Sequence, residues 1–204
     1  MSGSGDASSP WRTAAAAKLE PLANQALASP ETVRDERNEL YRTLMYLALS
    51  RNENTQTGLL EGKWLGELDA LKPADDEERS AVDIARVEAI QIYGDPERIL
   101  PALHSSEQAM AHNYNASLRV AQMEKAVKHY DAAIAACDRG LSRDPGALGH
   151  SWLLQTKAEA LRQKGEPAEA RETLEQALKA AQEIPSQSQR ENNVRRIKQA
   201  LGGA

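Results

Sequence analysis

The sequence contains two copies of one pattern of small and apolar residues, separated by 37 residues. The first copy is Ala133, Cys137, Gly140 and Leu141, and the second is Ala170, Leu174, Ala177 and Leu178. A weaker copy, with Ile99, Leu103 and Ser106 in the matching positions, lies 34 residues before the first. Residues spaced by three and four lie on one face of an α-helix, and small side chains there let a second helix come close. A period of this length is typical of stacked helical repeats.

The composition favours helices throughout the chain. Alanine (34 residues) and leucine (23) outnumber valine and isoleucine (13 together), and phenylalanine is absent. Alanine and leucine are strong helix formers, and no alternating apolar run bounded by turn residues predicts a strand. We therefore expect an all-α fold, a superhelix of about ten antiparallel helices joined by short turns, with a close-packed aliphatic core.

Proline, glycine and capping residues divide the chain into the expected helices and regions. We expect helices at about 9–28, 29–51, 59–71, 74–93, 95–112, 114–128, 130–143, 146–164, 166–184 and 186–201, with 146–150 either loop or early helix. Residues 1–8 are expected to be a disordered leader or a cloning remnant, and 9–204 a single helical domain. Within that domain, 9–73 lack the repeat, 74–185 contain the repeat units, and 186–201 form a capping helix.

The last two copies resemble the tetratricopeptide repeat. The matching residues are Tyr130, Ala133, Cys137, Gly140 and Pro145 in the central unit, and Leu154, Ala158, Leu161, Gly165, Ala170, Leu174 and Ala177 in the last unit. The central unit departs from the family pattern at Ser117, where a large aromatic residue is usual, and at Lys128, where the turn glycine is usual. The resemblance implies paired helices whose concave surface binds peptides or partner helices.

A second resemblance covers roughly Ala74 to Leu201. This stretch is similar to the helical region that follows the thioredoxin domain in some bacterial thioredoxin-family proteins. The chain has no CxxC motif and no βαβ pattern, so the resemblance implies an accessory helical module without redox activity. It also implies a periplasmic location as an alternative to a cytoplasmic one.

Charge and hydropathy exclude several classes of protein. The formal net charge is −5 with both signs mixed along the chain, which argues against binding of nucleic acid. No apolar run approaches the roughly 18 residues that span a bilayer. We therefore expect a soluble protein without membrane insertion, and its compartment stays open.

The residues that could support chemistry form no catalytic, metal or cofactor motif. Cys137 lies mid-helix among small residues, which indicates packing rather than a reactive thiol. His104 and Glu107 have a spacing that a metal pair could use, but no second pair accompanies them. The acidic run 74–79 and the basic residues Arg195, Arg196 and Lys198 are explained by favourable interaction with helix dipoles. We expect no enzyme activity, no metal and no cofactor.

The resemblance to tetratricopeptide repeats also implies which residues form the concave surface. They are Asn115, Leu118, Gln122 and Lys125 in the central unit, and Trp152, Gln155, Glu159 and Arg162 in the last unit. Amides can pair with an extended backbone, Lys125 and Arg162 can meet carboxylates, and Trp152 can take an apolar side chain. Alternatively, Trp152 covers the joint between two units. The expected partner is a protein or peptide of unknown identity, and the alternative is a structural domain that forms a homodimer.

Overall fold

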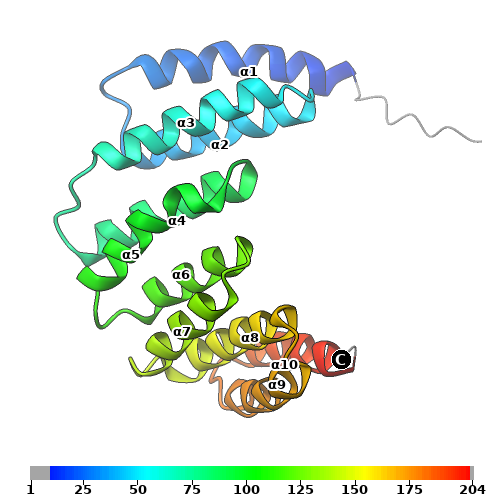
Figure 1. Ribbon diagram of the computed structural model, residues 1–204. Coiled ribbons are helices and arrows are strands. Elements are labelled where there is room, and N and C mark those ends of the chain that lie inside the picture. The colour runs from blue at the N-terminus through cyan, green and yellow to red at the C-terminus, as the bar shows by residue number, and fades with distance from the viewer. Residues whose placement is uncertain (1–9, 203–204) are drawn as a thin grey trace, which may run out of the picture. The chain divides into compact units, whose positions relative to one another are not determined.

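The computed structural model describes residues 10–202 and is helical throughout (Figure 1). The α-helices are α1 (Pro10–Ala28), α2 (Arg34–Ser50), α3 (Asn54–Ala70), α4 (Asp76–Ile92), α5 (Leu100–Ala109), α6 (Tyr114–Ala126), α7 (Tyr130–Leu141), α8 (Gly146–Lys164), α9 (Pro167–Gln182) and α10 (Gln187–Gly202). A short 3-10 helix, η1 (Pro96–Ile99), precedes α5. The predicted all-α class is confirmed, since no strand occurs between residues 10 and 202. The expected leader and residue 9, where the first helix was expected to begin, lie outside the described residues.

The described chain forms two compact units. The first contains α1 to α3 and the segment Glu88–Gly94, and the second contains Pro73–Val87 and the chain from Asp95 onward. Helix α4 therefore contributes residues to both units. The expectation that 9–204 fold as one continuous domain stays a prediction.

Two predicted helix starts were wrong. Helix α2 begins at Arg34 rather than at 29, because the Thr32 hydroxyl donates a hydrogen bond to the Ala26 carbonyl at 2.6 Å and holds the connection as a turn. Helix α3 begins at Asn54 rather than at 59, so most of the stretch predicted as a turn is helical. Its start is fixed by the Thr57 N–H, which donates to the Glu53 carbonyl at 2.9 Å.

One turn geometry closes three helical hairpins. Asn52, Lys128 and Gly165 have φ angles of 60°, 66° and 96°, in the left-handed region. In each turn the next backbone N–H donates to the carbonyl five residues earlier: Glu53 to Ala48, His129 to Glu124 and Glu166 to Leu161, each at 2.9 Å. This is the Schellman pattern of helix ends. The α2–α3 hairpin therefore has the same turn as α6–α7 and α8–α9, although its sequence shows no repeat.

The small-residue pattern lies on buried helix faces, as predicted. Ala133, Cys137 and Gly140 are buried in α7, and Ala170 and Ala177 are buried in α9. The matching residues of the weak copy, Ile99, Leu103 and Ser106, are also buried.

Gly140 lies where α7 closely approaches its neighbouring helices. A Cβ atom at this position would lie 2.7 Å from Leu153 Cδ2 on α8 and 3.1 Å from Ser117 Cβ on α6. The close contact of α6, α7 and α8 therefore depends on glycine here, and on the small Ser117 that replaces the usual large aromatic residue.

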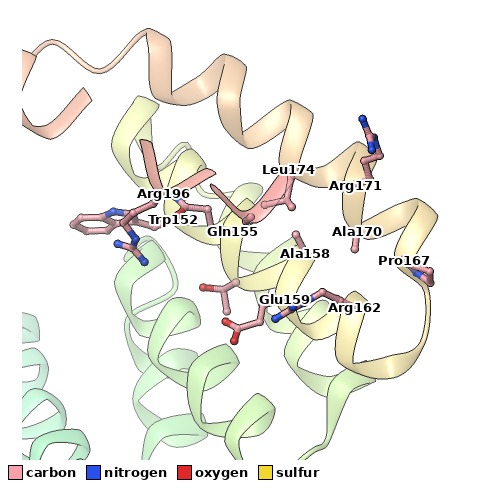
Figure 2. Close-up of a pocket in the computed structure, with 12 residues that line it drawn as sticks. Trp152, Gln155, Ala158, Glu159, Arg162, Pro167, Ala170, Arg171, Leu174 and Arg196 are labelled. Atoms are coloured by element: carbon pink, nitrogen blue, oxygen red, sulfur yellow. The ribbon is translucent and has the colours of Figure 1, made fainter. Parts of the chain in front are cut away.

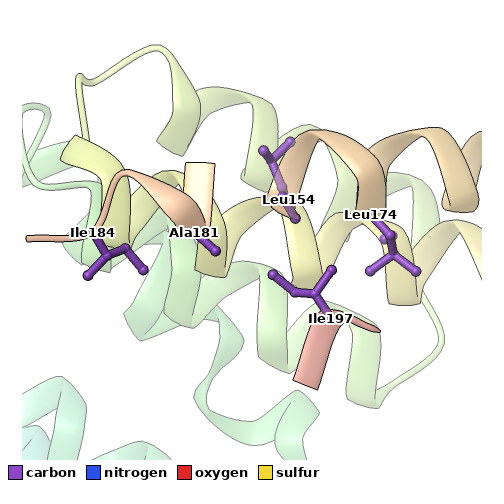
Figure 3. Packing of buried hydrophobic residues seen from close by; sticks show 7 residues of the cluster. Leu154, Leu174, Ala181, Ile184 and Ile197 are labelled. Carbon is purple, nitrogen blue, oxygen red and sulfur yellow. The ribbon is translucent and has the colours of Figure 1, made fainter. Parts of the chain in front are cut away.

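The hydrophobic core of the last hairpin continues onto α10. Leu154 and Ala158 of α8 pack with Leu174, Ala177 and Ala181 of α9, and Ile197 of α10 completes the cluster together with Ile184 (Figure 3). Helix α10 thus covers the apolar edge of the α8–α9 hairpin. This contact positions α10 beside the surface predicted to bind a partner.

Candidate functional site

The four residues predicted on α8 lie together around one cavity (Figure 2). Trp152, Gln155, Glu159 and Arg162 follow one another at steps of three and four residues, so they share one side of the helix. The cavity has a volume of about 540 Å³, is open to solvent on one side, and is lined by residues of α8, α9 and α10. Figure 2 shows Trp152 and Arg196 at one end and Pro167 at the other.

The four residues predicted on α6 do not line this cavity. Leu118 is buried, with 7 % of its surface exposed, and offers little area to a ligand. The Asn115 N–H donates to Asn113 Oδ1 at 2.9 Å at the start of α6. Gln122 and Lys125 are half-buried. The predicted residues of α6 therefore include polar groups, but they do not line the cavity that the predicted residues of α8 share.

The floor of the cavity is apolar. It is formed by Ala158, Ala170 and Leu174, all of them buried, and Ala158 and Leu174 belong to the hydrophobic core described above. Three of the lining residues are alanines, since Ala200 of α10 also reaches the cavity. Small side chains on opposing helices leave the space that larger residues would fill.

Hydrogen bonds hold Gln155 and join α8 to α10. The Gln155 amide nitrogen donates to Ser151 Oγ at 3.0 Å and to Asn193 Oδ1 on α10 at 3.2 Å. Asn193 is buried, and its own amide donates to the Gln189 carbonyl at 2.8 Å. Gln155 is therefore a fixed part of the cavity wall. Trp152, one turn earlier on α8, is half-buried, which agrees both with a place in the wall and with its role of covering the joint.

Positive charge dominates the rim of the cavity. The one lining carboxylate, Glu159, forms an ion pair with Lys125 of α6. Arginines line the cavity from three helices: Arg162 on α8, Arg171 on α9 and Arg196 on α10. Within residues 10–202, Arg162 and Arg196 form no ion pair, and Arg171 contacts Glu175 on its own helix at 3.4 Å, with both side chains more than half exposed.

Sequence reasoning missed Arg171, Arg196 and the contribution of α10. The basic residues of α10 were explained by the helix dipole, but this was wrong, because α10 extends to Gly202 and its last turn contains no basic residue. The signal was present in the repeat: the 37-residue offset relates Gln122 to Glu159 and Glu159 to Arg196. Arg196 therefore occupies the next equivalent position, on a helix that takes the place of a further repeat.

The histidine and carboxylate pair on α5 does not form one site. His104 Nε2 lies 2.7 Å from Glu124 Oε1, whereas Glu107 accepts hydrogen bonds from Arg139 and Ser117. Burial raises the pKa of Glu107, but these hydrogen bonds and the nearby arginines outweigh it, and the pKa lies below its usual value. No group of three or more His, Cys, Asp or Glu side chains in the described chain is arranged to hold a metal ion.

Cys137 is fully buried and unpaired with another cysteine. Burial raises the pKa of its thiol to about 12, with Asp138 contributing to the rise. A thiol that stays protonated at neutral pH is a poor nucleophile. The geometry therefore agrees with a packing role.

These features define an all-α protein built from helical hairpins, an architecture typical of modules that bind other proteins. The Tetratricopeptide repeat family model matches residues 125–189, which contain α7, α8, α9 and most of the cavity. The predicted resemblance is thus confirmed for residues 125–189.

Solved structures of similar architecture include two of MamA. MamA AMB-1 is 16 % identical over 87 % of this chain and 88 % of its own, with a TM-score of 0.46. MamA MSR-1 is 15 % identical over 83 % of this chain and 88 % of its own, with a TM-score of 0.47. A search of curated proteins gave no match. None of the helices between residues 10 and 202 is both long and apolar enough to cross a membrane.

Proposed function

We propose that the protein is a non-enzymatic interaction module that binds a peptide or a partner helix in the cavity formed by α8, α9 and α10. The observation that supports this function best is the cavity itself, with an apolar floor and polar groups held around it. Its volume of about 540 Å³ lies within the range of ligand pockets, roughly 300–1,000 Å³. It is large enough to receive side chains of a bound segment while the rest of that segment lies along α8.

The residues of the wall suit a peptide chain. The Gln155 amide is fixed by Ser151 and Asn193, so a ligand that pairs with it meets a group already in position. Preorganised groups lose less entropy on binding. Trp152 offers an apolar surface beside the cavity, and Arg162 offers a guanidinium free of any ion pair within residues 10–202.

Selection of random peptides on the immobilised protein, followed by fluorescence anisotropy with the selected peptide, tests this function. Trp152→Ala and Arg162→Ala should weaken binding, whereas Lys179→Ala, at an exposed position of α9 outside the cavity, should not. Trp152 is only half-buried, so its truncation should cost less than the roughly 3–5 kcal/mol of a core tryptophan. Unchanged binding by folded variants at both positions would exclude this cavity as the site.

The alternative is a structural domain that pairs with a second copy of itself. Sedimentation velocity over a range of protein concentrations separates the two functions, because self-association raises the mass without any peptide. A further proposal, from the thioredoxin-associated resemblance, is that the module serves a larger redox system. Co-purification of a thioredoxin-fold protein with the wild type, but not with Trp152→Ala, would support it.

A further inference from the structure

We propose that the segment bound in this cavity is acidic, with carboxylates that pair with Arg162, Arg171 and Arg196 and an aliphatic side chain that enters the floor. This inference rests on the proposed function and adds the chemistry of the partner. It also makes α10 a part of the binding site, since one of the three arginines comes from that helix.

The charge around the cavity is opposite to that of the whole chain. The formal net charge of the protein is −5, but the cavity is lined by three arginines and one glutamate, and Lys125 already neutralises that glutamate. Arg171 shares an exposed ion pair with Glu175, and Arg162 and Arg196 have no ion pair within residues 10–202. All three arginine side chains are exposed, and Figure 2 shows them at separate places around the cavity. A local excess of positive charge on an acidic protein favours a negatively charged ligand.

Helix dipoles do not account for this arrangement. Cations are favourable near the C-terminal end of a helix and unfavourable near the N-terminal end. Arg162 is in the last turn of α8, so the dipole explains it. Arg171 is in the second turn of α9, at the unfavourable end, and Arg196 is more than a turn from the end of α10. These two arginines therefore have no such structural reason to face the cavity.

Carboxylates fit the three guanidinium groups better than other anions do here. An arginine can donate two parallel hydrogen bonds to one carboxylate. Between the arginines, the floor of Ala158, Ala170 and Leu174 is apolar and accepts an aliphatic side chain. A ligand that combines both features is a peptide with acidic residues on either side of a leucine or a similar residue. A nucleic acid has no such side chain, and its long row of phosphates would be repelled by the acidic remainder of the protein.

The test uses two fluorescein-labelled hexapeptides that differ only in charge. One is Asp-Glu-Leu-Asp-Glu-Leu, and the other is its amide counterpart Asn-Gln-Leu-Asn-Gln-Leu. Anisotropy titration of the full chain should show the acidic peptide binding at least about tenfold more tightly, with affinity falling as salt rises because exposed charges are screened. The triple variant Arg162→Gln, Arg171→Gln, Arg196→Gln should lose about tenfold or more in affinity for the acidic peptide.

Two matched variants serve as controls. Arg195→Gln removes an exposed arginine next to Arg196 that does not line the cavity, and it should bind as the wild type does. The triple Arg→Lys variant keeps the charge but loses the paired hydrogen-bond geometry, so its affinity should lie between those of the wild type and the glutamine variant. Circular dichroism and urea unfolding check that each variant is folded.

Equal binding of the two peptides, or no loss in the folded triple glutamine variant, would overturn the inference. If a selected peptide still binds in a Trp152-dependent way after such a result, the proposed function stands and only the acidic partner is excluded. Binding of a ten-nucleotide thymidine oligomer as tight as that of the acidic peptide, and lost in the triple variant, would assign the arginines to phosphate instead. A dimer that dissociates in the triple variant without any peptide would assign them to self-association.

Discussion

The substitution Gly140→Ala adds one methyl group at the point where α6, α7 and α8 meet. The new Cβ atom would lie 2.7 and 3.0 Å from the two terminal carbons of Leu153 and 3.1 Å from Ser117 Cβ. Leu153 is fully buried and cannot move into solvent. Overpacking of a core costs about 1–3 kcal/mol, whereas alanine gains up to about 1 kcal/mol over glycine in a helix. We expect a net loss of about 1–2 kcal/mol in the free energy of unfolding of the second unit.

Gly66→Ala is the matched control. Gly66 lies in the middle of α3, and a Cβ atom there has no neighbour within 4 Å, so only the gain in helix propensity remains, up to about 1 kcal/mol. Hydrogen exchange measured by mass spectrometry reports the local stability of α7 and of α3 separately in each variant. A double-mutant cycle with Leu153→Val shows whether the loss of stability comes from the contact between the new methyl group and Leu153. The shorter valine side chain should recover part of that loss. Equal or higher stability of Gly140→Ala would refute the close approach.

Four further expectations concern three other sites. Because burial raises the pKa of Cys137 to about 12, an aromatic disulfide reagent at about pH 8 should label it slowly in the native protein and rapidly in urea; prompt native labelling would contradict its burial. The same rise in pKa predicts that the free energy of unfolding falls as the pH rises above about 8.5, because the thiol then ionises in the unfolded chain but stays protonated in the folded protein. Ala133→Leu, at a fully buried position of α7 outside the cavity, should cost about 1–3 kcal/mol in urea unfolding and Lys179→Leu less than about 0.5, and equal costs would show that the helix phase is wrong. Burial raises the pKa of Glu107, but the hydrogen bonds from Arg139 and Ser117 outweigh it, so this pKa is lower in the folded protein than in the unfolded chain. The stabilisation from these hydrogen bonds is therefore complete above about pH 4.3, the unfolded pKa, and is lost as the pH falls through the folded pKa. Urea midpoints measured against pH should decline less steeply in Glu107→Gln than in the wild type.

The repeated helical hairpins could be predicted from the sequence because close helix packing allows only small residues at certain positions. Ala133 and Ala177 are fully buried on helix faces that pack against neighbouring helices, and such faces admit few side chains, so spacing alone identified them. The α2–α3 hairpin was not recognised as similar because its buried positions are occupied by Thr57, Glu61 and Trp64. Larger and polar side chains at these positions do not repeat the pattern of small residues.

The residues around the cavity could be anticipated only in part, because the cavity depends on where helices separate. The sequence indicated which side of α8 is free, from Trp152 to Arg162. It did not show that α10 leaves a cavity beside α9, since that depends on packing around Ile197 and on the small Ala200. Arg171 and Arg196 reach the same cavity from different helices, and their approach is a property of the three-dimensional arrangement.

The shared left-handed turn has a consequence for the residues and chain lengths that such hairpins accept. Its backbone hydrogen bonds are made equally well with Asn52, Lys128 or Gly165 at the left-handed position, so the identity of that residue is free to drift while the hairpin persists. The equivalent position Gly94 also has a positive φ, of 144°. The intervals between successive turns are 42, 34 and 37 residues. Turns of this kind are therefore compatible with different numbers of residues between them, so a change of length within an interval need not disturb the turns at its ends.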